Sequence, residues 1–87
     1  MNTLKPLVQR LELVLNKFNI EEDIDIKITN IDDFDYQINN LVKYQKHKEI
    51  KEIEKKVSLV LSESKIIESW EISDKYFINI KISLSVL

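Results

Sequence analysis

The sequence of 87 residues contains neither glycine nor cysteine. Without glycine it cannot build a glycine-rich phosphate loop, a Walker motif or a dinucleotide-binding fingerprint. Without cysteine it has no disulfide framework, and no thiolate is available as a metal ligand. Its turns must instead use Asn, Asp and Ser, which adopt the required backbone angles at a higher energetic cost than glycine.

Histidine is almost as scarce, since His47 is the only one. It lies between lysines at the start of an expected helix, where a surface or capping role suits it. The sequence places no imidazole beside any of the serines, and it has neither a second histidine nor a cysteine. It therefore contains no persuasive nucleophile–base pair. The acidic residues lack the spacing and the turn glycine of a calcium loop. We therefore predict a protein that is not an enzyme, with no catalytic residues, no metal site and no cofactor.

Long apolar runs are absent too. No stretch approaches the roughly 18 apolar residues that a membrane helix requires. Lys5, Gln9 and Arg10 interrupt the first apolar stretch, which therefore lacks the hydrophobic region of a signal peptide. The sequence predicts no membrane partner and a cytoplasmic location.

Charge is unevenly distributed along the chain, although the net charge is only −2. Seven acidic residues fall within 21–35, where Lys27 is the only basic residue. Six lysines fall within 43–56 and are interleaved with three glutamates. The lysine-rich segment could meet phosphate, whereas the acidic segment would repel it and suits a basic partner. The glutamates weaken a phosphate-binding role, so a solvated helix face is the simpler interpretation of Lys48, Lys51 and Lys55.

The hydrophobic pattern predicts one domain over residues 1–87. Apolar spacings of three and four residues favour helices, and strict alternation favours strands. The expected elements are a helix at 3–18, a strand at 24–30, helices at 36–45 and 47–63, and strands at 67–73 and 76–84. Thr3 or Asn2 would cap the first helix and Asp35 the second. This order predicts an α+β domain, helix-strand-helix-helix-strand-strand, with a small, mainly antiparallel sheet covered by helices.

The last strand carries an aromatic residue on its polar face. Alternation places one set of side chains toward the core, namely Tyr76, Ile78, Ile80, Ile82 and Leu84. The opposite face then carries Phe77, Asn79, Lys81 and Ser83. A ring flanked by an amide and a cation on an exposed face is typical of a surface that stacks on an unpaired base. The alternative is an edge-strand aromatic that packs under a loop or helix.

Two segments of the chain resemble the N-terminal additional domain of arginyl-tRNA synthetase. That family carries Phe-Gly-Asp-Tyr-Gln-x-Asn at the start of its second helix, and the chain reads Phe34-Asp35-Tyr36-Gln37-Ile38-Asn39, without the glycine. Across its final hairpin the family carries Val-Glu-Ile-Ala-Gly-Pro-Gly-Phe-Ile-Asn-Ile, and the chain reads Trp70-Glu71-Ile72-Ser73-Asp74-Lys75-Tyr76-Phe77-Ile78-Asn79-Ile80. The order and separation of the two segments agree as well, so the resemblance covers nearly the whole chain.

The resemblance implies a domain that binds the D-loop at the outer corner of tRNA, most naturally tRNA-Arg. In the family an aromatic residue and the asparagine two positions later engage an exposed D-loop base, and these positions correspond to Phe77 and Asn79. To these we add, from the residues alone, phosphate contacts by Lys81 and some of Lys43, Lys46, Lys48 and Lys51. For the first segment a structural role is favoured, with Asp35 as a helix cap and with Phe34 and Tyr36 in the core.

The sequence departs from the family at the final hairpin, where Asp74-Lys75-Tyr76 replaces Gly-Pro-Gly. Asp74 thereby adds a negative charge beside the expected site. A chain without glycine also lacks the His-x-Gly-His signature of the catalytic domain. We therefore expect a diverged, free-standing relative and not a synthetase.

Functions other than RNA binding stay open at this point. The fold could serve as an acidic protein-binding module, such as an immunity protein or antitoxin against a basic, tRNA-directed toxin. Residues 21–35 would then be its working surface. A synthetase accessory protein that docks on another protein is a third alternative. The exposed edges of the sheet would allow a dimer, which the sequence does not predict.

Overall fold

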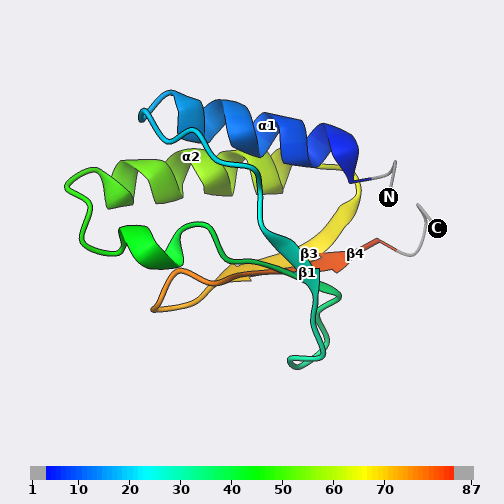
Figure 1. Ribbon diagram of the computed structural model, residues 1–87. Helices are drawn as coiled ribbons and strands as arrows, with labels where there is room; N and C mark the ends of the chain where they lie inside the picture. The colour runs from blue at the N-terminus through cyan, green and yellow to red at the C-terminus, as the bar shows by residue number, and fades with distance from the viewer. Residues whose placement is uncertain (1–3, 84–87) are drawn as a thin grey trace.

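Two helices cover one face of a four-stranded antiparallel sheet, and the other face of the sheet is open (Figure 1). This computed structural model describes residues 4–83. The elements in order are α1 (Lys5–Asn16), β1 (Ile26–Ile28), β2 (Tyr36–Ile38), the short 3-10 helix η1 (Val42–Tyr44), α2 (Ile50–Glu63), β3 (Ile67–Ile72) and β4 (Ile78–Ile82). The strands lie in the order β1-β2-β4-β3, so β2 and β4 form the centre of the sheet.

The α+β class, both long helices and three of the strands are confirmed. Pro6 lies in the first turn of α1, where its missing N–H has no partner to lose. The His47 Nδ1 accepts a 3.0 Å hydrogen bond from the N–H of Glu49, the residue just before α2, while the N-cap itself has no side-chain hydrogen bond. The expected caps Thr3 and Asn2 and the end of the last strand at Leu84 lie outside the described residues. Within residues 4–83, neither helix is long and apolar enough to cross a membrane.

The helix predicted at 36–45 is wrong. Tyr36–Ile38 forms the central strand β2, and only Val42–Tyr44 turns as a 3-10 helix. Asp35 is no helix cap, because its N–H donates to the Ile80 carbonyl at 2.8 Å and its Oδ2 accepts from the Ile82 N–H at 2.8 Å. Pairing with β4 outweighs a local helix preference, since backbone bonds to a distant strand satisfy this segment while its apolar side chains enter the core.

The core lies between the helix pair and the sheet. Ile53 of α2 and Ile80 of β4 are both 0% exposed, and Leu11 and Leu15 of α1 are buried with them. Trp70 of β3 lies opposite Ile80 and packs against this core. Each fully buried aliphatic side chain contributes about 1.5–3 kcal/mol relative to leaving it exposed.

The turn between β3 and β4 puts a tyrosine in a left-handed conformation. Tyr76 has a φ of 67° at the position where the resemblance places the second glycine of Gly-Pro-Gly. Its N–H donates to the Ser73 carbonyl at 2.9 Å, and the Ser73 N–H donates to the Phe77 carbonyl at 2.9 Å. A non-glycine residue there costs about 1–2 kcal/mol. Burial of the tyrosine ring, with the Lys51 Nζ 5.8 Å from its centroid, offsets that cost.

Two isoleucines at opposite extremes of burial test the importance of the core. Ile80→Ala removes a side chain that is 0% exposed, so we expect it to lower the free energy of unfolding by about 2–5 kcal/mol. The matched control Ile28→Ala removes the same atoms from a side chain that is 81% exposed, and we expect a change within about 0.5 kcal/mol. Urea unfolding followed by circular dichroism measures both. Equal losses in the two variants would contradict this position of the core.

Candidate nucleic-acid interface

A row of polar side chains crosses the open face of the sheet. The strand register places Lys27 of β1 opposite Gln37 of β2, Gln37 opposite Asn79 of β4, and Asn79 opposite Glu71 of β3. Their neighbours along the central strands β2 and β4, namely Ile38, Ile78 and Ile80, are buried on the side of the helices. The open face therefore offers hydrogen-bonding groups in place of an apolar surface.

Asn79 is more enclosed than the sequence predicted. It lies on the expected face, but it is only 4% exposed, and its Oδ1 accepts a 3.0 Å hydrogen bond from the Gln37 Nε2. The sequence predicted an exposed face at this position, but Asn79 is enclosed because β4 is a central strand. Side chains of β2 and β3 flank Asn79 on both sides.

Phe77 lies at the hairpin end of β4 and is partly exposed. It lies outside the hydrophobic core cluster, and its backbone N–H is held by the Ser73 Oγ at 3.1 Å. The ring is therefore attached to an ordered turn and keeps accessible surface. An aromatic ring that can stack on a base requires both features.

Lys81 forms ion pairs with carboxylates. Its Nζ lies 2.5 Å from the Asp33 Oδ2 and 3.4 Å from the Glu68 Oε2. The hydrogen bond to Asp33 raises the pKa of Lys81 above its ordinary value of 10.5. A phosphate would have to displace Asp33 to use this charge.

The other predicted lysines differ in what they contact. The Lys43 Nζ lies 2.7 Å from the Glu22 Oε2, and Lys51 lies against the Tyr76 ring and 3.9 Å from the Glu54 Oε1. Lys46 and Lys48 are exposed. Because η1, the start of α2 and the β3–β4 turn lie at one end of the molecule, these lysines share that end with Phe77 (Figure 1).

Lys75 is a candidate that the sequence analysis did not include. It is exposed in the β3–β4 turn, two residues before Phe77. The signal available in the sequence was the location of Lys75 in the expected turn, between Asp74 and Tyr76 and close to Phe77. It adds a cation to the end of the molecule that carries Phe77.

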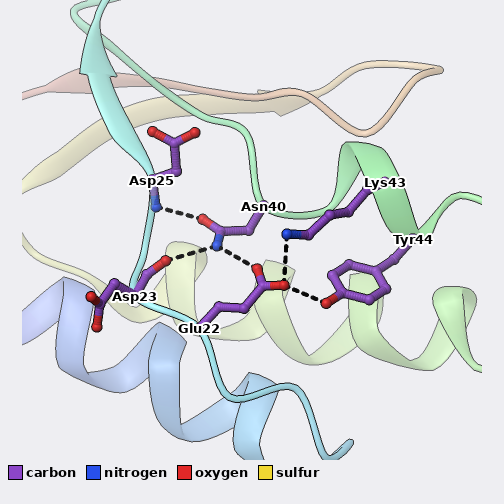
Figure 2. A network of polar contacts seen from close by, with 6 residues as sticks. All are labelled: Glu22, Asp23, Asp25, Asn40, Lys43 and Tyr44. Atoms are coloured by element: carbon purple, nitrogen blue, oxygen red, sulfur yellow. Dashed lines mark hydrogen bonds and ion pairs between the residues drawn. The ribbon is translucent and has the colours of Figure 1, made fainter.

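A polar network fixes the acidic segment against η1 (Figure 2). Asn40 is buried, and its Oδ1 accepts from the Asp25 N–H at 2.6 Å. Its Nδ2 donates to the Asp23 carbonyl at 2.9 Å and to the Glu22 Oε1 at 3.0 Å. The other carboxylate oxygen of Glu22 accepts from the Tyr44 hydroxyl and pairs with Lys43. The sequence analysis missed this network, because its members are up to 22 residues apart.

The network keeps Glu22 ionised. Burial raises the pKa of Glu22, but the hydrogen bonds from Lys43, Tyr44 and Asn40 lower it, and the net value lies below the ordinary 4.5. Several other carboxylates of residues 21–35 also have partners within the chain. Asp33 pairs with Lys81, Asp35 accepts from the Ile82 N–H, and Asp25 lies 3.9 Å from the Lys27 Nζ. Among residues 4–83, no group of three or more potential ligands is arranged to hold a metal ion.

A scan against protein-family models matches residues 3–82 to the arginyl tRNA synthetase N terminal domain. The match spans almost the entire chain. The chain belongs to this family. Comparisons with curated proteins and with solved structures gave no match. The fold and the open face described above are therefore those of an arginyl-tRNA synthetase N-terminal domain.

The two segments that carried the resemblance to the arginyl-tRNA synthetase domain meet in space. Gln37 of the first segment donates its hydrogen bond to Asn79 of the second, 42 residues later. Tyr36 packs against the core as expected, whereas Phe34 is partly exposed and lies outside the core cluster. The Asn39 N–H donates to the Asp25 carbonyl at 3.0 Å, while its Oδ1 is buried without a hydrogen-bond partner. The first segment therefore builds the strand that borders the second.

The Glu22 network makes stability depend on pH. The folded-state pKa of Glu22 is depressed, so its stabilisation is fully present above about pH 4.5 and is lost as the pH falls through the folded-state pKa. Glu22→Gln should lower the free energy of unfolding by about 1–2 kcal/mol at pH 7, and by progressively less as the pH falls below about 4.5. Thermal unfolding across this pH range measures the difference. Glu21→Gln, at the exposed neighbouring position, is the control, and an equal effect in both variants would contradict the assignment.

Proposed function

We propose that this domain is a non-catalytic RNA-binding module that contacts the D-loop at the outer corner of tRNA, most naturally tRNA-Arg. The observation that carries the proposal is the meeting of the two family segments on the open face of the sheet. Phe77, which is partly exposed and whose backbone is held by an ordered turn, directly precedes β4, the strand that carries Asn79. Family membership supports a role connected with tRNA.

In this proposal Phe77 stacks on an unpaired base of the D-loop. Asn79 and Gln37 form the polar surface beside it and bond to the edge of that base. Because the Asn79 Oδ1 is already bonded to Gln37, base contact requires the Gln37–Asn79 hydrogen bond to open or to be shared. The amides therefore act as a pair, and they give selectivity for one base edge over another.

Phosphate contacts in the proposal come from the hairpin end of the molecule. Lys46, Lys48 and Lys75 are exposed there, and Lys51 lies beside Tyr76. Lys43 and Lys81 contribute only when phosphate displaces Glu22 and Asp33. We expect modest affinity with a strong salt dependence, because each lysine that meets a phosphate releases counterions.

Phe77→Ala tests the stacking role. Stacking of one base on an aromatic side chain contributes about 1–3 kcal/mol, so the variant should raise the Kd for tRNA roughly 5- to 150-fold. The matched control is Phe34→Ala, which removes the same ring from another partly exposed position outside the core. Fluorescence anisotropy with labelled tRNA at low salt measures both. No binding by the wild type at low salt would refute the RNA function, and equal losses in the two variants would refute the site.

The Lys81–Asp33 ion pair gives a second test, in which binding should become tighter. Asp33→Asn removes the closer of the two carboxylates that pair with Lys81, leaving Glu68 at 3.4 Å, and takes a negative charge from the phosphate path. We therefore expect a roughly three- to tenfold lower Kd at low salt. Asp32→Asn removes the same charge one residue away and controls for net charge. The double variant Asp33→Asn with Lys81→Gln should lose the gain. A gain that persists without Lys81 would show that this lysine is not a phosphate contact.

The competing proposal is a protein-binding module, such as an immunity protein, an antitoxin or a synthetase accessory protein, that uses residues 21–35. The exposed carboxylates of Asp32 and Asp33 support it. It has less support because Glu22 is bound within the chain and Asp33 is paired with Lys81. Charge reversal at Asp32, Asp33 and Asp35 would abolish capture of a basic partner in this case, whereas Phe77→Ala would leave capture unchanged.

A further inference from the structure

The large hydrophobic side chains that are exposed within residues 4–83 form two pairs. Leu13 of α1 is 62% exposed and Leu59 of α2 is 53% exposed. Ile28 at the end of β1 is 81% exposed, and Ile31 in the loop that follows is 48% exposed. Each pair would lose unfavourable contact with water if another surface covered it.

The leucine pair lies in a basic groove between the two helices. Leu13 and Leu59 line a cavity of about 270 Å³ together with Arg10, Lys17 and Lys56. Arg10 is neutralised by Glu63, whose Oε1 lies 2.7 Å from its Nη2. Lys17 and Lys56 leave the groove with a net positive rim. An occupant with apolar side chains flanked by carboxylates would match both features.

The isoleucine pair belongs to an acidic loop of this same chain. Ile28 and Ile31 are followed by Asp32, Asp33 and Asp35, all exposed. The loop between β1 and β2 projects from the sheet on the side away from α1 (Figure 1). It therefore cannot reach the groove of its own chain, but it is free to reach the groove of another copy.

We propose that the groove between α1 and α2 binds the β1–β2 loop of a second copy of this chain. Ile28 and Ile31 cover Leu13 and Leu59. The exposed carboxylate of Asp32 meets the basic rim formed by Lys17 and Lys56, while Asp33 stays paired with Lys81. Because two different surfaces meet, the contact is heterologous, and each added copy presents a further free groove and loop. Neither surface includes Phe77, and the RNA site is touched by the loop only through the Asp33–Lys81 ion pair.

Neutral polar substitutions at either surface test the proposal. The groove variant is Leu13→Gln with Leu59→Gln, and the loop variant is Ile28→Thr with Ile31→Thr. In sedimentation equilibrium from about 10 μM to about 1 mM, the average mass of the wild type should rise with concentration. Each variant should associate at least about tenfold more weakly. Asn16→Gln and Asn30→Thr, at exposed positions near the two surfaces, should associate like the wild type.

Mixing the two variants separates a heterologous contact from a symmetric one. The loop variant keeps an intact groove, and the groove variant keeps an intact loop. An equimolar mixture should therefore form dimers and no larger species, although each variant alone is monomeric. A wild type that stays monomeric at 1 mM, or a mixture that stays monomeric, would overturn the proposal. Unchanged thermal unfolding of both variants establishes that the substitutions act at the surface, and tRNA binding by the loop variant tests the RNA function separately.

Discussion

The pairing of β2 with β4 is the contact on which the rest of this structure depends. The hairpin of β1 with β2 and the hairpin of β3 with β4 each form between strands close in sequence. Only the register Tyr36–Ile80, Gln37–Asn79 and Ile38–Ile78 joins them into one sheet. The same pairing places Ile38, Ile78 and Ile80 in the core and Gln37 beside Asn79 on the open face. A shift by one residue would exchange these two faces and leave apolar side chains in water.

The charges of this domain act mainly through their partners within the chain. Glu22 is held by Asn40, Tyr44 and Lys43, and Asp33 is held by Lys81. Both contacts connect the acidic segment to parts of the chain that carry candidate phosphate ligands. Acidic residues therefore compete with phosphate for two of the lysines. The lysines at the hairpin end face less of this competition, which is why the proposed RNA contact is centred on Phe77 and not on Lys81.

The absence of glycine has a visible structural cost. Within residues 4–83, three residues adopt positive φ angles, namely Asn19 at 62°, Asp32 at 49° and Tyr76 at 67°. Asn and Asp are the side chains expected to replace glycine in such turns, and the sequence analysis anticipated them. Tyr76 was not anticipated, because a bulky residue is unfavourable there. It is tolerated because its ring is buried beside Lys51, so packing across the domain stabilises the strained turn.

The sequence by itself determined the α+β class, both long helices, the last hairpin and the family. Their signals are local, since helical spacing and strand alternation act over a few residues. It also predicted that Phe77 and Asn79 form a pair on one face of a strand, whereas β4 begins only at Ile78. Tertiary structure alone decided that residues 36–38 form a strand and that Asn79 is enclosed beside Gln37. It also decided that Lys81 is paired with Asp33. Each of these outcomes depends on contacts between residues 40 or more positions apart, whose energies outweigh the local preferences that a sequence displays.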